Sequence, residues 1–398
     1  MDNTIINVDK LDLTQSVTAP KGFLAAGVAA GLKKSLKKDM ALVVNQGPAY
    51  AAAAVFTSNR FSAAPVDWSK KVTANHMLHA VILNSGGANA CTGIQGAADA
   101  QRMAEETARV IGCEQADVAV CSTGLIGELL PMDKVSKGIE AAANALSDDG
   151  GRDAAEAIMT TDTVSKQAAY TSAQGWSVGG MAKGAGMLAP ALATMLVVIT
   201  TDADISGDEA DQALREATAV SFDRADSDGC MSTNDSVILM ANAASGVAPD
   251  RSEFRGALSA VCVSLARQLI ADAEGAEHSI SIRVTSAATV PDALEVARSI
   301  ARSNLFKCAI SGNDPNWGRV LASMGTTGAA YDPGDVDVYF NGVGVFVAGA
   351  PSAPRDQVDL TPFDVTVEVA LHCGDEEATI WTNDLTHGYV SENADYSS

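Results

Sequence analysis

Strand-sized apolar segments alternate with amphipathic helical segments along this chain of 398 residues. Residues 40–45 (MALVVN) and 195–200 (MLVVIT) have the length and apolar content of buried strands. Residues 95–111 and 252–272 instead repeat apolar residues at helical spacing. Such alternation is typical of α/β proteins, so the sequence predicts an α/β fold of the mixed, α+β type.

Turn and strand signals divide the chain further. Asn341-Gly342 separates two apolar runs and is the strongest hairpin signal in the sequence. A second hairpin is expected around the AQG turn at residues 173–175. Strand signals dominate after Ile280. We therefore expect a larger domain at residues 1–280 and a smaller C-terminal domain at residues 281–398.

The charge balance limits the partners of the chain. The sequence has 27 Lys and Arg against 49 Asp and Glu, which gives a net charge of −22 at pH 7. Nucleic acid and anionic lipid both require a basic face, so neither nucleic acid nor a membrane is an expected partner. No run reaches the roughly 20 apolar residues that span a bilayer. Residues 1–12 carry acids and no apolar signal core, so we expect a cytoplasmic location.

Cysteine and histidine give little support to a metal centre. The seven cysteines include no CxxC pair and are expected to be reduced and buried. His76 and His79 stand three residues apart without an HExxH motif, so we expect a solvated pair on one helix face. GxSxG, Walker A and GxGxxG motifs are missing, which disfavours the usual hydrolase, phosphoryl-transfer and dinucleotide enzymes. A Ser-His-Asp triad stays open, because it needs only one histidine. No metal and no cofactor are expected.

The segment 181–203 (MAKGAGMLAPALATMLVVITTDA) is chemically the most unusual. It begins with glycines around Lys183 and ends as an apolar strand that opens at Ala193-Thr194. One interpretation is a plain turn before a core strand, which the residues alone favour. The other is a strained turn in which the Thr194 hydroxyl attacks the preceding carbonyl and frees an N-terminal amine. That amine can act as general base for its own hydroxyl, so no histidine is needed.

Two glycine-containing loops follow predicted strands. Residues 122–128 (STGLIGE) form either an ordinary strand-to-loop turn or an oxyanion hole. In an oxyanion hole the Gly124 N–H and the Thr123 hydroxyl would stabilise a negatively charged oxygen. Residues 84–93 (NSGGANACTG) are a weaker candidate, for an anion-binding nest of backbone N–H groups.

Three other segments have both a structural and a functional interpretation. Glu274, beside Gly275, is either a solvated acid or a group that recognises a ligand amine. Residues 311–319 (SGNDPNWGR) form either a capped turn before a helix that begins near Asn316 or a wall of an active site. The C-terminal residues 392–398 would ordinarily be frayed.

Together these segments resemble the ornithine acetyltransferase family of arginine biosynthesis, also called glutamate N-acetyltransferases or the ArgJ family. The resemblance covers nearly the whole chain. It is carried by APKGFLAAGVAAG, LNSGGANACTG, CSTGLIGELLPM, AIMTTD, the segment 181–203, STND, DAEGAE, GNDPNWGR and ENADYSS. It implies a layered α/β/β/α fold of the DmpA/ArgJ type with a smaller C-terminal α/β domain. Ala191 departs from the polar residue of many members, a minor change because cleavage does not need that side chain.

The resemblance also implies a self-processing enzyme. Cleavage between Ala193 and Thr194 would give an alpha chain of residues 1–193 and a beta chain of residues 194–398, assembled as two copies of each. In a ping-pong reaction Thr194 would take the acetyl group of N2-acetylornithine and pass it to glutamate. Thr123 and Gly124 match the oxyanion pair. No cofactor is implied, and the use of acetyl-CoA as a co-substrate stays open.

The substrate-binding positions are also implied by the resemblance: Thr160, Lys183, Thr194, Glu274, Asn393 and Ser398. Thr161 adjoins Thr160, so that position is uncertain by one residue. Lys183 can pair with the carboxylate and Glu274 with the ammonium of an amino acid, and the C-terminal tail would then be ordered over the site. Two rival functions remain, a self-processing aminopeptidase that passes its acyl group to water and a non-catalytic amino-acid-binding protein.

Overall fold

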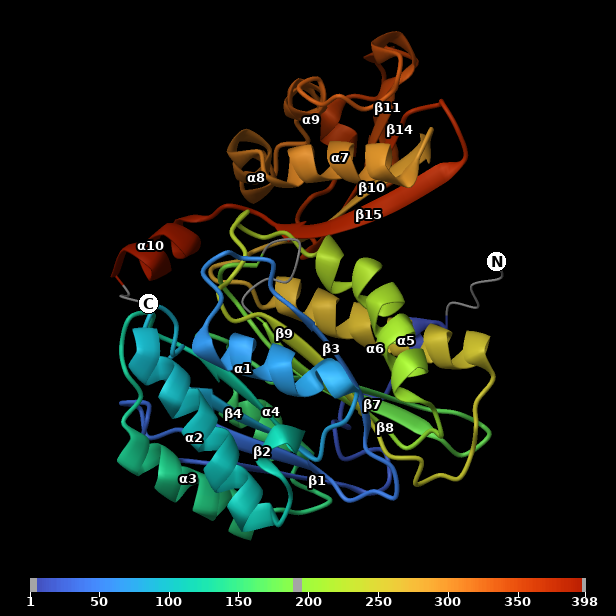
Figure 1. Cartoon of the computed structure of the whole chain (residues 1–398). Helices are drawn as coiled ribbons and strands as arrows, with labels where there is room; N and C mark the ends of the chain where they lie inside the picture. Colours follow the sequence, from blue (N-terminus) through green and yellow to red (C-terminus); the bar gives the residue numbers. More distant parts are fainter. Residues whose placement is uncertain (1–5, 189–194, 396–398) are drawn as a thin grey trace.

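Two sheets stacked face to face form the larger part of the molecule (Figure 1). The structure, a computed structural model, describes residues 6–188 and 195–395. Within these residues the first sheet has the strand order β1 (Phe23–Val28), β2 (Met40–Asn45), β4 (Ala80–Ser85) and β5 (Val118–Thr123). The second has the order β3 (Ala51–Phe56), β9 (Ser236–Ala241), β8 (Leu196–Thr201), β7 (Ser177–Lys183) and β6 (Lys166–Thr171).

Apolar side chains fill the space between the sheets, and helices cover both outer faces. Val43 and Val81 of the first sheet share one buried cluster with Met181, Val198 and Ile238 of the second. Helices α2 (Gly93–Ile111) and α3 (Met132–Asn144) cover the first sheet. Helices α5 (Gly207–Ala219) and α6 (Arg251–Ala271) cover the second. Helix α1 (Ala64–Val72) packs against β5, and α4 (Gly151–Ala157) against β1. The expected α/β/β/α layering is confirmed.

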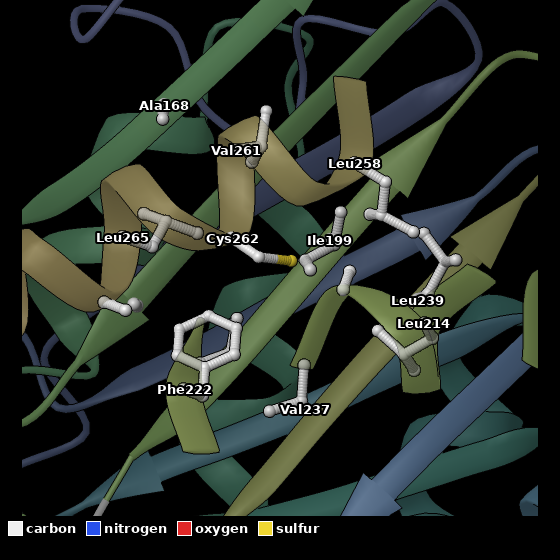
Figure 2. Packing of buried hydrophobic residues seen from close by; sticks show 14 of the residues in the cluster. Ala168, Ile199, Leu214, Phe222, Val237, Leu239, Leu258, Val261, Cys262 and Leu265 are labelled. Carbon is white, nitrogen blue, oxygen red and sulfur yellow. The ribbon is translucent and has the colours of Figure 1, made fainter. Parts of the chain in front are cut away.

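Among the helices that the structure describes, α6 alone is long and apolar enough to span a bilayer, with a mean hydropathy of 1.2. However, 61% of that stretch is buried inside the protein. Figure 2 shows Leu258, Cys262 and Leu265 of α6 in one cluster with Ile199 and Leu239 of β8 and β9. The apolar character of α6 is therefore that of a core helix packed on a sheet.

A third sheet with its own core stands beside the layered part (Figure 1). Its described order is β13 (Ala350–Pro351), β12 (Val343–Val347), β11 (Asp337–Phe340), β14 (Asp364–Ala370), β10 (Ser279–Ala287) and β15 (Glu376–Asn383). Three helices accompany it: α7 (Val290–Ala301), α8 (Asn304–Ser311) and α9 (Trp317–Met324). The last helix, α10 (His387–Asp395), returns to the layered part. The division into two domains at residue 280 stays a prediction.

Both expected hairpins are confirmed. β11 and β12 pair antiparallel across Asn341 and Gly342, whose φ angles of 46° and 82° fit a tight hairpin turn. β6 and β7 pair antiparallel around the AQG turn. Other turns join strands that do not pair with each other. β2 and β3, joined by the QGPAY turn, lie in different sheets, and β10 separates β14 from β15.

The expected helix face for His76 and His79 and the expected burial of all the cysteines are wrong, whereas the expected free thiols are confirmed. His76 and His79 share no helix face: His76 has a left-handed backbone (φ 58°) after a short 3₁₀ turn, and His79 stacks on Tyr50 with ring centroids 3.7 Å apart. All seven cysteines are free thiols, but only Cys121 and Cys262 are buried. Within residues 6–188 and 195–395, no group of three His, Cys, Asp or Glu side chains could hold a metal ion.

Candidate active site

The site lies where a strand of each sheet ends. β5 ends at Thr123 and β7 ends at Lys183, and the Lys183 Nζ atom lies 3.4 Å from Thr123 Oγ1. A pocket with about 110 Å³ of free space opens at this point. Its lining includes Thr123, Gly124, Thr160, Thr161, Lys183, Glu274 and Asn393. The structure therefore brings together all the described residues among the catalytic and substrate-binding positions that the family resemblance implies.

The turn after β5 is built so that only glycine fits at position 124. The N–H groups of Gly86 and Gly87 hold the Thr123 carbonyl at 2.9 and 3.0 Å. Gly124 follows with φ 130°, and a Cβ there would lie 2.5 Å from the Gly87 nitrogen. Within the described ranges the Gly124 N–H makes no backbone hydrogen bond. This N–H and the Thr123 hydroxyl thus remain available to an oxygen in the pocket.

Buried side-chain amides fix the neighbouring loop 84–93. Asn84 Oδ1 accepts a hydrogen bond from the Ser122 hydroxyl (2.6 Å), and Asn84 Nδ2 donates to the Gly87 carbonyl (3.0 Å). Asn234 Nδ2 donates to the carbonyls of Ala88 (2.7 Å) and Ser122 (2.8 Å). These bonds hold the loop against the end of β5, so the turn at Thr123-Gly124 is preorganised before any ligand arrives.

Lys183 is a buried cation at the base of the pocket, with only 1% of its surface exposed. Its Nζ donates to Thr160 Oγ1 at 2.7 Å and lies 3.9 Å from Asp162 Oδ2. Burial lowers the pKa of Lys183, and the charge of Asp162 opposes that shift. A carboxylate entering the pocket would favour the charged lysine further.

A buried network that sequence analysis missed supports this lysine. Lys166 Nζ lies 2.6 Å from both Asp162 Oδ1 and Asp272 Oδ2, and the side chains of Lys166 and Asp162 are fully buried. Asp162 also accepts the N–H groups of Thr160 (2.9 Å) and Gly184 (2.7 Å). Burial opposes ionisation of Asp162, but Lys183 and Lys166 outweigh it and hold the pKa of that carboxyl below its ordinary value. The network joins the loop after α4, the end of β7 and the end of α6.

Glu274 stands in the pocket with both carboxylate oxygens occupied. The Thr161 hydroxyl donates to Oε1 at 2.8 Å, and Asn393 Nδ2 of α10 donates to Oε2 at 3.0 Å. The Glu274 N–H donates to the Ala185 carbonyl at 2.9 Å. The two adjacent threonines thus have different partners, because Thr160 contacts Lys183 while Thr161 contacts Glu274.

Ala193, Thr194 and Ser398 lie outside the described residues, so the structure gives no position for the cleavage site or for the last residue. The residue after Thr194 is described: the Met195 N–H donates to Asp235 Oδ1 at 3.0 Å. Asp235 is fully buried, and burial raises the pKa of its carboxyl well above the ordinary value. Sequence analysis assigned no role to Asp235, although its STND motif was noted.

The segment 311–319 does not line the pocket. Asn316 caps α9 by accepting the Arg319 N–H at 3.2 Å, and Trp317 stacks on Phe346 of the third sheet with ring centroids 5.0 Å apart. The helix start predicted near Asn316 is therefore confirmed, and the capped turn describes this segment.

Known proteins resemble this chain over most of its length. The model of the ArgJ family matches residues 24–398. The arginine biosynthesis bifunctional protein ArgJ of Streptomyces coelicolor is 58% identical over 383 residues, which cover 96% of this chain and all of that protein. The protein of the same name from Mycobacterium leprae is 53% identical and covers 99% of this chain and 98% of its own length.

Solved structures give shorter matches. Ornithine acetyltransferase of Mycobacterium tuberculosis, solved in complex with ornithine, is 53% identical, with a TM-score of 0.45 over 47% of this chain and 98% of that chain. A β-aminopeptidase of Burkholderia is 13% identical, with a TM-score of 0.41 over 65% of this chain and 87% of its own.

Proposed function

This chain belongs to the ArgJ family, and from that premise we propose how its pocket moves an acetyl group between amino acids. The chain is an acetyltransferase of arginine biosynthesis, with ornithine acetyltransferase activity. One observation carries the proposal for the site. The pocket holds a buried cation, Lys183, and a carboxylate, Glu274, beside the Thr123-Gly124 turn. A pocket with both charges suits an amino acid, whose carboxylate and ammonium need partners of opposite sign.

The reaction would proceed through an acetyl-enzyme on Thr194. The Thr194 hydroxyl attacks the acetyl carbonyl of N2-acetylornithine while the α-amine of Thr194 takes the hydroxyl proton. The Gly124 N–H and the Thr123 hydroxyl stabilise the resulting oxyanion. The C–N bond then breaks, and the departing α-nitrogen of ornithine receives that proton. Glutamate enters, its amine attacks the acetyl-Thr194 ester, and N-acetylglutamate leaves as the Thr194 hydroxyl is restored.

Substrate binding would use the charges already in the pocket. Lys183, held by Thr160 at 2.7 Å, pairs with the substrate α-carboxylate. Glu274, held by Asn393 at 3.0 Å, pairs with the side-chain ammonium of ornithine. Ser398 completes this set as a proposal from the family resemblance. Because α10 reaches Glu274 through Asn393, the C-terminal segment contributes directly to the pocket.

The remaining features of the proposal concern the protein as a whole. Self-cleavage between Ala193 and Thr194 frees the amine that the reaction needs as a base. The products are an alpha chain of residues 1–193 and a beta chain of residues 194–398, two of each in the assembled enzyme. We place the enzyme in the cytoplasm, where its amino-acid substrates are made.

The function is tested by the fate of the acetyl group. Incubation with N2-acetylornithine and glutamate should give N-acetylglutamate and ornithine in equal amounts. Chromatography of the reaction mixture measures both products. Acetyl-CoA with glutamate should also give N-acetylglutamate, as expected for a chain 58% identical to a protein named bifunctional. Free acetate without N-acetylglutamate would instead indicate an aminopeptidase-like enzyme, and no turnover of either donor would indicate a binding protein.

Substitutions of the adjacent Thr160 and Thr161 should have different effects on the kinetic constants for the two substrates. Thr161→Val removes a hydrogen bond to Glu274 and should raise KM for N2-acetylornithine about 2- to 10-fold, with a smaller change for glutamate, which has no side-chain ammonium. Thr160→Val removes a partner of the buried Lys183 charge and should lower kcat/KM for both substrates about 10- to 100-fold. Valine keeps the shape of threonine, so each variant serves as the other's control. Identical effects on both substrates from both variants would contradict these separate roles.

A further inference from the structure

A run of lysines adjoins the pocket in an otherwise acidic protein. Residues 33–38 (KKSLKK) contain four of the 27 Lys and Arg in a chain of net charge −22. Lys34 and Lys37 are exposed, and neither forms an ion pair or hydrogen bond with any residue in the described ranges. Leu36, between them, is 76% exposed and has a left-handed backbone (φ 57°). The loop therefore presents two unpaired positive charges and an apolar side chain to solvent.

The backbone of the loop is held in place by a buried carboxylate, and Lys33 Nζ closes the loop by donating to the Lys38 carbonyl at 2.8 Å. Asp39 accepts the N–H groups of Ala30 (2.6 Å), Leu32 (2.6 Å) and Lys33 (3.0 Å). A fifth lysine joins from α3, where Lys134 Nζ donates to the Gly31 carbonyl at 2.7 Å. Because the Asp39 bonds fix the backbone, the exposed lysine side chains are free to contact a ligand without loss of the loop structure.

Lys38 is the lysine of the run that forms ion pairs. Its Nζ pairs with Asp153 (2.5 Å) and Glu156 (2.8 Å) near α4, so its charge is already compensated. Lys33 is also engaged, because its Nζ donates to the Lys38 carbonyl at 2.8 Å. The free positive charge of the loop thus lies on Lys34 and Lys37.

Contacts connect this loop to the oxyanion turn. A Cβ on Gly86 would lie only 3.1 Å from Leu32 Cβ, and the Gly86 N–H holds the Thr123 carbonyl at 2.9 Å. Lys33 is close enough to the pocket for the charges of Lys183 and Asp162 to act on it. Burial lowers the pKa of Lys33 to about 8, Asp39 opposes that shift, and Lys183 adds to it. An anion bound at the loop would favour the charged form of Lys33.

Part of the pocket lining is apolar. Leu125, Ile126 and Met187 belong to it, and Ile126 and Met187 are 40% and 39% exposed. The site thus combines charged groups, partly exposed apolar side chains and a neighbouring basic loop. These three features suit a ligand that has a small acyl end, an extended uncharged arm and a phosphorylated head.

We propose that the lysine loop, defined as Lys33, Lys34 and Lys37 with Lys134, binds the phosphates of acetyl-CoA while Leu125, Ile126 and Met187 contact its pantetheine arm. This inference rests on the acetyl-CoA activity in the proposed function. The Thr194 hydroxyl attacks the thioester carbonyl and the C–S bond breaks. The sulfur takes the proton that the Thr194 amine removed, which releases CoA thiol and leaves the same acetyl-enzyme.

The test compares donors with and without phosphates. In the double variant Lys34→Gln/Lys37→Gln, the KM for acetyl-CoA at low ionic strength should rise about threefold or more, because two charge-assisted contacts are lost. The KM values for acetyl-pantetheine, which lacks the phosphates, and for N2-acetylornithine should stay unchanged. The KM of the wild type for acetyl-CoA should rise with added salt, and that of the variant should rise less.

The control removes the same two charges elsewhere. Lys70 and Lys71, on α1, do not line the pocket, so Lys70→Gln/Lys71→Gln should keep the wild-type KM for every donor. An acetyl-CoA KM changed by less than threefold in Lys34→Gln/Lys37→Gln would overturn the inference, as would an equal rise with acetyl-pantetheine or in the control. A wild-type protein inactive with both thioesters would overturn the acetyl-CoA activity and this inference together, while transfer from N2-acetylornithine would still stand.

Discussion

Thr194→Ala is expected to remain a single chain of 40.8 kDa on a denaturing gel and to lose acetyl transfer. The alanine lacks the hydroxyl that would attack the Ala193 carbonyl, so the chain cannot cleave itself and the base amine is never freed. It also lacks the nucleophile for the acetyl group. Because one change removes the nucleophile and its base together, kcat should fall by about 10⁴-fold or more.

The matched control lies on β8, the strand whose described residues follow Thr194 in the sequence. Thr201 ends β8, is fully buried and donates its hydroxyl to the Ser177 carbonyl at 2.7 Å. Thr201→Ala should cost stability of about 1 kcal/mol in urea unfolding but should still yield two chains and turn over substrate. A Thr194→Ala protein that matures and transfers acetyl groups would show that another residue is the nucleophile.

Individual elements of this fold were predictable because their signals are local. The apolar run at residues 40–45 coincides with β2, that at residues 195–200 matches β8 to within one residue, and the Asn341-Gly342 turn joins β11 to β12. Strand pairing was not predictable in the same way. β10 lies between β14 and β15 because Ile280 and Ile282 complete a core with residues far along the chain. The sequence of the short turn that joins β14 to β15 therefore does not indicate that β10 lies between them.

The residues of the candidate site could be predicted because they belong to long motifs. The buried charged residues that support the site could not be predicted. Asp162, Lys166 and Asp272 look like solvated residues in the sequence, because local composition carries no sign of their burial. In the structure their ion pairs of 2.6 Å hold the pocket loops around Lys183. A buried charge is tolerated only when its partners are also buried, so this network appears only once the three segments are brought together. The same reasoning applies to Asp235, whose role beside Met195 depends on β8 and β9 pairing.

Gly124→Ala should lower kcat about 10²- to 10³-fold, the loss expected when one preorganised oxyanion donor is displaced. A Cβ at this position would lie 2.5 Å from the Gly87 nitrogen and 2.8 Å from the Gly86 carbonyl carbon. Both neighbours are backbone atoms held by the Thr123 carbonyl, so they cannot move aside cheaply. The turn must shift instead, and the Gly124 N–H then no longer points at the place where the oxyanion forms.

Gly127→Ala is the control for Gly124→Ala. It measures the cost of alanine in a left-handed backbone without the overlap between a Cβ and neighbouring backbone atoms. Gly127 lies three residues further on with φ 85°, and a Cβ there would meet no atom within 4 Å. Alanine at position 127 should therefore cost about 1 kcal/mol of stability from its backbone conformation alone and leave kcat near the wild-type value. Steady-state formation of N-acetylglutamate and urea unfolding of both variants give the comparison. If both alanines lowered kcat equally, overlap with Gly86 and Gly87 would not be the cause; if Gly124→Ala kept full kcat, the Gly124 N–H would not be an oxyanion donor.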